Sequence, residues 1–222
     1  MISPDFSEEE RLMADGYDRV VGVDEVGRGA LSGPVMAAAV VLDPSFIPDG
    51  ITDSKILTSH QRETLAQKIH QSADVSIASV NVEIIDQINI TAASRLATKK
   101  AILSLRIPAD IALVDGNHIP SDLDIPALSL VRGDTRSLSI AAASIVAKVS
   151  RDNIMQELAQ DYPSYGWERN VGYPTKEHVQ ALGRLGVTPY HRRSFKPVKT
   201  VIQSQTVKQI KSGRFGQSGS AF

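Results

Sequence analysis

The chain has 222 residues, of which 42% are hydrophobic and 22% charged, which is enough for the core of one ordinary domain and argues against global disorder. It has no cysteine, which excludes disulfide scaffolds, thiolate metal sites and a cysteine nucleophile, and its formal net charge of −1 speaks against a uniformly basic nucleic-acid binder. No apolar run approaches the roughly 18 residues of a membrane helix, and the acidic start is neither a secretory signal nor a transit peptide, so we expect a cytoplasmic protein with no membrane partner.

The first part of the chain predicts strands. After a polar lead-in over residues 1–18, the segment 19–26 is a Val-rich run, and 34–42 is a second apolar run bounded by Gly33-Pro34 and Asp43-Pro44. Apolar runs of strand length between glycine and proline residues are typical of a hairpin-like pair.

Helices and strands then alternate. Thr58 and Gln61 have the spacing of a capping box and predict a helix that begins there. Further helices are expected over residues 83–106, 137–162 and 175–186, and further strands over 74–82, 111–114 and 127–131. This order predicts an α/β domain over 19–198 with a mixed sheet and a helical C-terminal part, followed by a flexible basic tail over 199–222.

The most informative residues are acids at the ends of buried elements. Asp24 and Glu25 lie inside the Val-rich strand, where burial of a carboxylate is costly unless something compensates. Asp115 ends a short apolar strand, and Asp134 stands just before the second long helix. Neighbouring strand residues point to opposite faces, so Asp24 and Glu25 could share a ligand only at a strand end or kink, which Gly27 would supply.

Four carboxylates without a histidine cluster form a set of hard oxygen ligands, which suits Mg²⁺ or Mn²⁺ rather than zinc. Plainer explanations stay open, because Asp134 alone could be a helix N-cap and Asp115 with Gly116 could form a turn. The spacing in the sequence does not prove that the four acids meet.

A glycine-rich segment follows the acid pair, over residues 27–34. Glycines let a backbone approach a ligand closely and present its N–H groups, although such a segment alone is a weak signal. It is not a Walker loop, because no Gly-Lys-Ser/Thr follows, and it is not a dinucleotide fingerprint, because a strand rather than a helix follows.

The order of the motifs is more specific than any one of them, and together they resemble ribonuclease HII over about residues 18–198. The matching segments are Asp24-Glu25-Val26-Gly27-Arg28-Gly29-Ala30-Leu31-Ser32-Gly33-Pro34, Asp53-Ser54-Lys55, Val114-Asp115-Gly116, Gly133-Asp134, the run Ser139–Lys148, Gly172-Tyr173-Pro174-Thr175 and His191-Arg192-Arg193-Ser194-Phe195.

The resemblance implies a ribonuclease H-like fold with a mixed five-stranded sheet flanked by helices. It also implies an endonuclease that cuts the RNA strand of RNA–DNA hybrids and cuts 5′ of a single ribonucleotide embedded in duplex DNA. By the same resemblance Asp24, Glu25, Asp115 and Asp134 are the catalytic, metal-binding acids, and Gly27, Arg28, Gly29 and Tyr173 contact the substrate at the junction. We hypothesise hydrolysis with two divalent ions, Mn²⁺ or Mg²⁺, that leaves 5′-phosphate and 3′-hydroxyl ends.

Several polar residues of the matching motifs are candidate phosphate contacts. Lys55, Ser144 and Lys148 are the main ones, and Arg192, Arg193 and Lys196 are further ones. The five histidines show no metal-ligand spacing, and we assign none of them a catalytic role.

Three alternatives remain. A ribonuclease HIII-like enzyme would share the chemistry, but that group typically has Gly-Lys-Gly in the loop and an extra N-terminal domain, whereas this chain has Arg28 and only 23 residues before Asp24. Another metal nuclease of the same fold class would lack the Gly-Arg-Gly and late tyrosine combination. A hybrid-binding module that does not cut would not need all four acids. Nothing in the sequence demands an oligomer, so a monomer is expected.

The net charge conceals an asymmetry. Residues 1–177 contain 16 Lys and Arg against 25 Asp and Glu, whereas residues 178–222 contain eight Lys and Arg and no acid. The basic end coincides with the late motifs and is a plausible track for a phosphate backbone, so the average charge is a poor guide to nucleic-acid binding here.

Overall fold

The computed structural model describes the backbone of residues 3–211 and the side chains of residues 3–207. The chain divides into two compact units: the first holds the residues up to Arg28 together with Pro34–Ile154, and the second holds Gly29–Gly33 and the residues from Met155 onward. The boundary therefore falls inside the range 19–198 for which one domain was expected.

The first unit contains the sheet. Its elements in chain order are α1 (Ser7–Ala14), β1 (Val20–Val26), β2 (Val35–Val41), α2 (Ser59–Ser72), β3 (Asp74–Val80), α3 (Val82–Leu103), β4 (Ile111–Asp115), β5 (Ala127–Leu130), the 3₁₀ turn η1 (Gly133–Thr135) and most of α4 (Leu138–Asp161). The strand order is β3-β2-β1-β4-β5. The pairs β1–β2 and β2–β3 are antiparallel, whereas β1–β4 and β4–β5 are parallel, which confirms the mixed five-stranded sheet.

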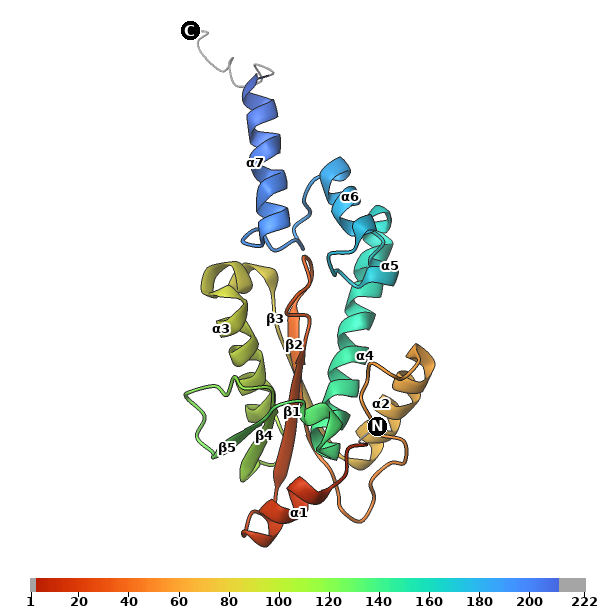
Figure 1. Ribbon diagram of the computed structural model, residues 1–222, viewed down its shortest axis with the longest axis vertical. Coiled ribbons are helices and arrows are strands. Elements are labelled where there is room, and N and C mark those ends of the chain that lie inside the picture. The colour runs from red at the N-terminus through yellow and green to blue at the C-terminus, as the bar shows by residue number, and fades with distance from the viewer. Residues whose placement is uncertain (1–2, 212–222) are drawn as a thin grey trace. The chain divides into compact units, whose positions relative to one another are not determined.

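Helices flank this sheet, with α3 against β1, β2 and β3 and with α2 and α4 on the opposite side (Figure 1). The capping box that opens α2 is present as predicted, because Gln61 N–H donates to the Thr58 hydroxyl and the Gln61 side chain accepts from Thr58 N–H. Strand β2 is buried along its whole length, as expected for a continuous run of small and β-branched residues covered on both faces.

The start of α4 lies directly on the central strand. A Cβ added at Gly22 of β1 would stand 2.2 Å from the Ser139 carbonyl carbon, and Ala141, Ala142 and Ala143 behind it are fully buried. The small side chains of this segment allow the start of α4 to approach β1 this closely.

Two features of the first unit differ from the sequence prediction. The lead-in is not merely polar, because α1 buries Leu12 in a cluster with Val20 and Ile140 and buries Glu9 completely. The helix predicted over 83–106 is interrupted at Asn89, whose φ of 67° breaks the helix and whose side chain accepts from the N–H groups of Thr91 and Ala92 as a new cap.

The second unit is helical apart from its loops. It contains the end of α4, η2 (Pro163–Tyr165), α5 (Trp167–Asn170), α6 (Lys176–Leu185) and α7 (Lys196–Lys211). Its core has an aromatic part around Trp167 and an aliphatic part in which Leu31, Leu182 and Val198 pack together.

Helix α7 extends into the tail over 199–222 for which flexibility was predicted. Val201 and Ile202 pack against the aliphatic part of the core, so the segment has more to bury than its Ser- and Gln-rich composition indicated. Residues 212–222 of the predicted tail lie outside the described residues. Across the described helices, none combines the length and apolarity that crossing a membrane requires.

Candidate active site

Three of the four acids meet at one edge of the sheet because three strands run parallel there. The β1–β4 register pairs Val23 with Val114, so the next residues, Asp24 and Asp115, are neighbours on adjacent strands. Strand β5 continues into η1, which carries Asp134, and Gly133 N–H donates to Asp115 Oδ1 at 2.7 Å. The carboxyl ends of parallel strands are the usual place for a ligand site in an α/β fold.

Asp24 is buried close to two other carboxylates. It is 9% exposed, and burial, followed by the charges of Asp115 and Glu25, raises its pKa well above the ordinary value. A hydrogen bond from the Ser144 hydroxyl and one from Glu25 N–H at 2.7 Å oppose this rise. Ser54 Oγ lies 2.9 Å from Ser144 Oγ, so Ser54 donates to Ser144 while Ser144 donates to Asp24.

Asp115 and Asp134 are held differently. Burial raises the pKa of Asp115, the Gly133 N–H opposes the rise, and the charges of Asp134 and Glu25 add to it. Asp134 is buried and accepts from Lys55 Nζ at 2.6 Å. Partial burial acts to lower the pKa of Lys55, but the hydrogen bond and charge of Asp134 outweigh it and raise this pKa.

The fourth acid, Glu25, forms an ion pair with Arg28 at 2.9 Å. Between them in the chain, Gly27 has a φ of +91°, and a Cβ added there would lie 2.2 Å from Nε of the fully buried Arg151. Gly27 is therefore required by its own fold, since Arg151 donates to the Pro34 carbonyl directly beside it. From the sequence we attributed to this glycine a kink after the acid pair and the close approach of a ligand, and we missed Arg151.

The donor set fits a hard divalent cation. In the part of the chain that the structure describes, no three acidic or histidine side chains already stand as a metal site; each acid instead has a donor from its own chain. Two of those donors, Lys55 and Arg28, supply positive charge where carboxylates are crowded. Burial and the neighbouring carboxylates raise the pKa values of Asp24 and Asp115, so a bound divalent cation would favour their charged forms.

The remaining candidates of the first unit divide into two groups. Lys55 and Ser144 contact the acids directly, whereas Lys148 forms an ion pair with Asp152 one turn further along α4, at 2.7 Å. Ser54 was not singled out from the sequence, although its place beside Lys55 in the Asp-Ser-Lys segment was a usable signal.

In the second unit, Tyr173 and Gly29 lie together. A Cβ added at Gly29 would stand 3.8 Å from Cε1 of the Tyr173 ring, so the ring lies beside this glycine. Arg192, a candidate phosphate contact, is instead fully buried and donates through Nε and Nη2 to the Gly33 carbonyl. Its role is therefore to hold the glycine-rich segment, which corrects the expectation of a surface contact.

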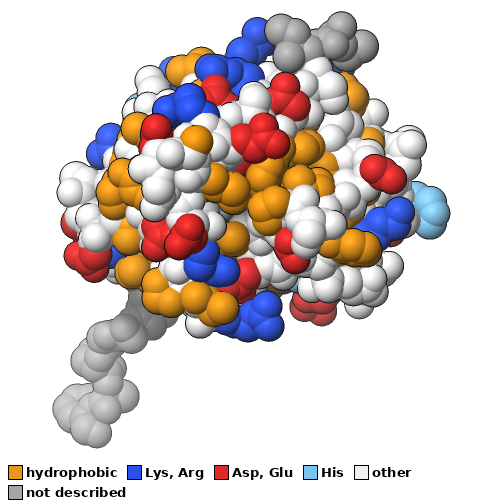
Figure 2. All heavy atoms as spheres, turned by 90° about the horizontal axis from the view of Figure 1, so that it is seen from below, with side chains coloured by type: hydrophobic (Ala, Val, Ile, Leu, Met, Phe, Trp, Pro, Cys, Tyr) orange, Lys and Arg blue, Asp and Glu red, His pale blue; other side chains and the backbone are white. Residues whose placement is uncertain are grey.

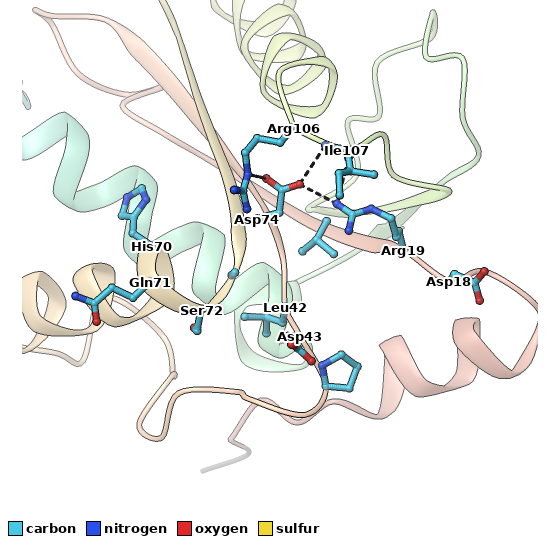
Figure 3. A pocket seen from close by; sticks show the side chains of 13 residues that line it. Asp18, Arg19, Leu42, Asp43, His70, Gln71, Ser72, Asp74, Arg106 and Ile107 are labelled. Carbon is cyan, nitrogen blue, oxygen red and sulfur yellow. Dashed lines mark hydrogen bonds and ion pairs between the residues drawn. The ribbon is translucent and has the colours of Figure 1, made fainter.

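A cavity of about 490 Å³ lies in the first unit away from the acids (Figure 3). It contains Arg19, Arg106 and the buried Asp74, which accepts from both arginines at 2.8 and 3.3 Å. Arg19 precedes Asp24 by five residues, about 17 Å along an extended strand. The cavity is thus separate from the acid cluster.

On the face of the molecule in Figure 2, hydrophobic, acidic and basic side chains are interspersed.

Comparison with known proteins gives a family for this arrangement. The family model described as Ribonuclease HII matches residues 21–198. The ribonuclease HII of Ruegeria pomeroyi is 56% identical over 205 residues, covering 92% of this chain and 88% of the relative, and that of Paracoccus denitrificans is 55% identical over 199 residues, covering 90% and 95%.

Solved structures agree with the fold. The ribonuclease H2 of Pyrococcus horikoshii has a TM-score of 0.71 at 27% identity and covers 84% of this chain and 98% of its own. A Bst-RNase HIII in complex with Mn²⁺ has a TM-score of 0.65 at 18% identity, covering 84% and 70%. Since the family model and curated relatives above half identity both span most of the sequence, the chain belongs to the ribonuclease HII family, the ribonucleases H of RNA–DNA hybrids.

Proposed function

We propose that the chain is a metal-dependent endoribonuclease that cuts the RNA strand of RNA–DNA hybrids and cuts 5′ of single ribonucleotides in duplex DNA, leaving 5′-phosphate and 3′-hydroxyl ends. The observation that carries the proposal is the convergence of Asp24, Asp115 and Asp134 at the carboxyl ends of β1, β4 and β5. The family membership supports it, as does the Mn²⁺ bound by the structurally similar Bst-RNase HIII.

In this proposal Asp24, Glu25, Asp115 and Asp134 would hold two divalent ions, Mg²⁺ or Mn²⁺. When bound, such ions would activate a water and neutralise negative charge on the leaving 3′ oxygen. Ser144 and Gly133 N–H keep Asp24 and Asp115 oriented through hydrogen bonds that do not depend on a ligand. Preorganised carboxylates of this kind lose little freedom when a cation and a phosphate arrive.

Lys55 has a second task in the proposal. It holds Asp134 in the structure, and its side chain is 73% exposed, so it can leave that carboxylate for a substrate phosphate once other positive charge reaches the acids. Lys148 and Ser144 are the further phosphate contacts proposed here, Lys148 after release from Asp152.

Specificity for ribose needs a reader of the 2′-hydroxyl, because this group distinguishes RNA from DNA. We assign the reading to the backbone of Gly27, Arg28 and Gly29. Tyr173 would stack on the sugar of the next nucleotide and disfavour a hydroxyl there. The contact of the Tyr173 ring with Gly29 supports a shared task.

Replacing Asp115 by Asn tests the catalytic assignment. The variant should lose at least about 100-fold in kcat on a labelled hybrid at saturating Mg²⁺, since one of the carboxylates that attract the cations is removed, whereas hybrid binding measured by fluorescence anisotropy should persist. The matched control is Asp124→Asn, an exposed aspartate outside the cluster. Near-normal turnover of Asp115→Asn would refute the assignment.

Replacing Tyr173 tests the specificity assignment. Tyr173→Ala should reduce cleavage of a single-ribonucleotide duplex relative to a long hybrid by about tenfold, because base or sugar stacking contributes about 1–3 kcal/mol. Tyr173→Phe keeps the ring and should retain the preference. If Tyr173→Ala and the wild type show the same preference for the single-ribonucleotide duplex, Tyr173 does not contribute to recognition of the ribonucleotide.

A further inference from the structure

A buried pair of histidines lies next to the Tyr173 carbonyl in the second unit. His178 of α6 and His191 of the following loop are 0% and 1% exposed, and their Nε2 atoms are 3.1 Å apart. Trp167 Nε1 donates to the same His178 Nε2 at 3.1 Å. The proposed reaction uses neither histidine, although burying two imidazoles is costly unless their nitrogens are satisfied.

The hydrogen bonds fix one tautomer for each ring. His178 Nδ1 lies 3.0 Å from the Tyr173 carbonyl, which can only accept, so His178 carries its proton on Nδ1 and accepts at Nε2. His191 Nδ1 accepts from the backbone N–H of Thr188 at 3.0 Å, so His191 carries its proton on Nε2 and donates to His178. Donation therefore runs in one direction, from His191 through His178 to the Tyr173 carbonyl.

The histidine pair joins two stretches of backbone, and both of them form hydrogen bonds with Leu31 in the middle of the glycine-rich segment. On the Tyr173 side, Leu31 N–H donates to the Gly172 carbonyl at 2.7 Å. On the His191 side, Arg192 N–H donates to the Leu31 carbonyl at 2.8 Å. Leu31 is thus held between the backbone at Gly172 and the backbone at Arg192. The histidine pair joins these two stretches of backbone through its own hydrogen bonds.

We propose that His178 and His191 are positioning residues for ribonucleotide recognition: their one-way hydrogen bonds fix the Tyr173 backbone, and with it the Tyr173 ring, against the Gly29 backbone. The ligand feature that this geometry selects is a ribose 2′-hydroxyl next to a deoxyribose. The inference rests on the proposed function, in which Tyr173 and Gly29 contact the substrate.

The environment keeps both rings neutral. Burial, and then the neighbouring His178, lowers the pKa of His191 to about 3, and burial lowers the pKa of His178. His191 Nδ1 faces the Thr188 N–H and, at 2.9 Å, the Thr188 hydroxyl, so a second proton there would lose the bond from the N–H, and a second proton on His178 would face both Trp167 and His191. The tautomers are therefore stable at neutral pH.

The tautomers can be measured on the unmodified protein. A long-range ¹H–¹⁵N correlation spectrum of the wild type should show His178 protonated at Nδ1 and His191 at Nε2 near pH 7, with His191 unchanged down to pH 5. The opposite tautomer at either ring near pH 7, or protonation of His191 in this range, would overturn the inference without any variant having to fold.

Two substitutions of His178 distinguish the role of its Nδ1 from that of its Nε2. His178→Asn places an amide N–H near the position of Nδ1 and can keep the bond to the Tyr173 carbonyl, whereas His178→Gln places its amide near Nε2 and loses that bond. The ratio of kcat/KM on a single-ribonucleotide duplex to that on a long hybrid should fall about tenfold in His178→Gln and stay within about twofold of wild type in His178→Asn. Thermal unfolding of both variants serves as the control for general destabilisation.

Equal ratios in the two variants would overturn the positioning role. If Tyr173→Ala loses the preference while His178→Gln keeps it, the inference fails and the proposed function stands. If Tyr173→Ala keeps the preference, the role of Tyr173 in the proposed function fails, and the tautomer measurement still decides whether the histidine network exists.

Discussion

Asp24 illustrates, at the scale of single residues, how position in the sheet sets the chemistry of a side chain. It lies on the central strand, next to Asp115 across the parallel register, and its hydrogen bonds come from Ser144 and the adjacent backbone. These partners orient the carboxylate but do not neutralise it. Burial and the neighbouring carboxylates therefore disfavour the charged form of Asp24 on this strand.

Removing this charge should stabilise the protein. Asp24→Asn should raise Tm by about 2–4 °C at neutral pH in a chelating buffer, the shift that 1 kcal/mol produces in a chain of this size. A pKa raised in the folded state means that stability from protonated Asp24 is present below the ordinary value of 3.8 and is lost as pH rises through the folded pKa. The advantage of the variant should therefore shrink as pH falls toward 4, which unfolding curves at several pH values would measure.

Divalent cations should reverse the order of the two Tm values, so that the wild type becomes more stable than Asp24→Asn. If Mg²⁺ binds at the acids as proposed, it should raise the Tm of the wild type, whereas Asp24→Asn should respond less. The control is again Asp124→Asn, which is exposed and should change Tm little under either condition. A Tm for Asp24→Asn below that of wild type in chelator would contradict the electrostatic account of the cluster.

At the scale of elements, α1 is tied to α4 by a buried carboxylate. Glu9 Oε1 accepts from the Ser137 hydroxyl at 2.6 Å and from Ser139 N–H at 2.8 Å, at the first turn of α4. A carboxylate at a helix N-terminus satisfies free N–H groups and interacts favourably with the helix dipole. Because the start of α4 also lies on Gly22, this contact supports the element that carries Ser144 to Asp24.

Glu9→Ala should therefore lower the free energy of unfolding by about 2–3 kcal/mol, because it leaves buried donors at Ser137 and Ser139 without their partner. Urea unfolding followed by circular dichroism would measure the loss. The exposed neighbour Glu10→Ala is the matched control and should stay within about 0.5 kcal/mol of wild type. Equal stabilities of the two variants would show that α1 does not support α4.

The five strands and α2 could be predicted because their signals are local: apolar runs between glycine and proline, and the Thr58–Gln61 cap. Helices α1 and α7 were harder to predict, because each buries only a few residues of a mostly polar sequence and gains stability from tertiary packing.

The site residues also differ in how far the sequence reveals them. The acids stand out as charges in apolar strands, whereas Lys55–Asp134 and His178–His191 join residues distant in sequence, with no periodicity to reveal them.

At the scale of the whole molecule, the charge asymmetry of the sequence follows the two units. All four acids lie in the first unit, and residues 178–222, which contain no acid, belong to the second. The eight basic residues there do not share one role, since Arg192 is buried on the Gly33 carbonyl, whereas Arg184 and Lys199 are exposed. The first unit thus holds the proposed chemistry and the second the proposed contact of Tyr173 with Gly29.

The most direct test of the central claim is a product map of the wild-type protein on a DNA duplex that contains one ribonucleotide, with Mg²⁺ or Mn²⁺ present. We expect one nick on the 5′ side of the ribonucleotide, with a 3′-hydroxyl on one fragment and a 5′-phosphate on the other, and no nick in chelator. A cut on the 3′ side of the ribonucleotide, a 2′,3′-cyclic phosphate end, or cleavage that persists in chelator would contradict it.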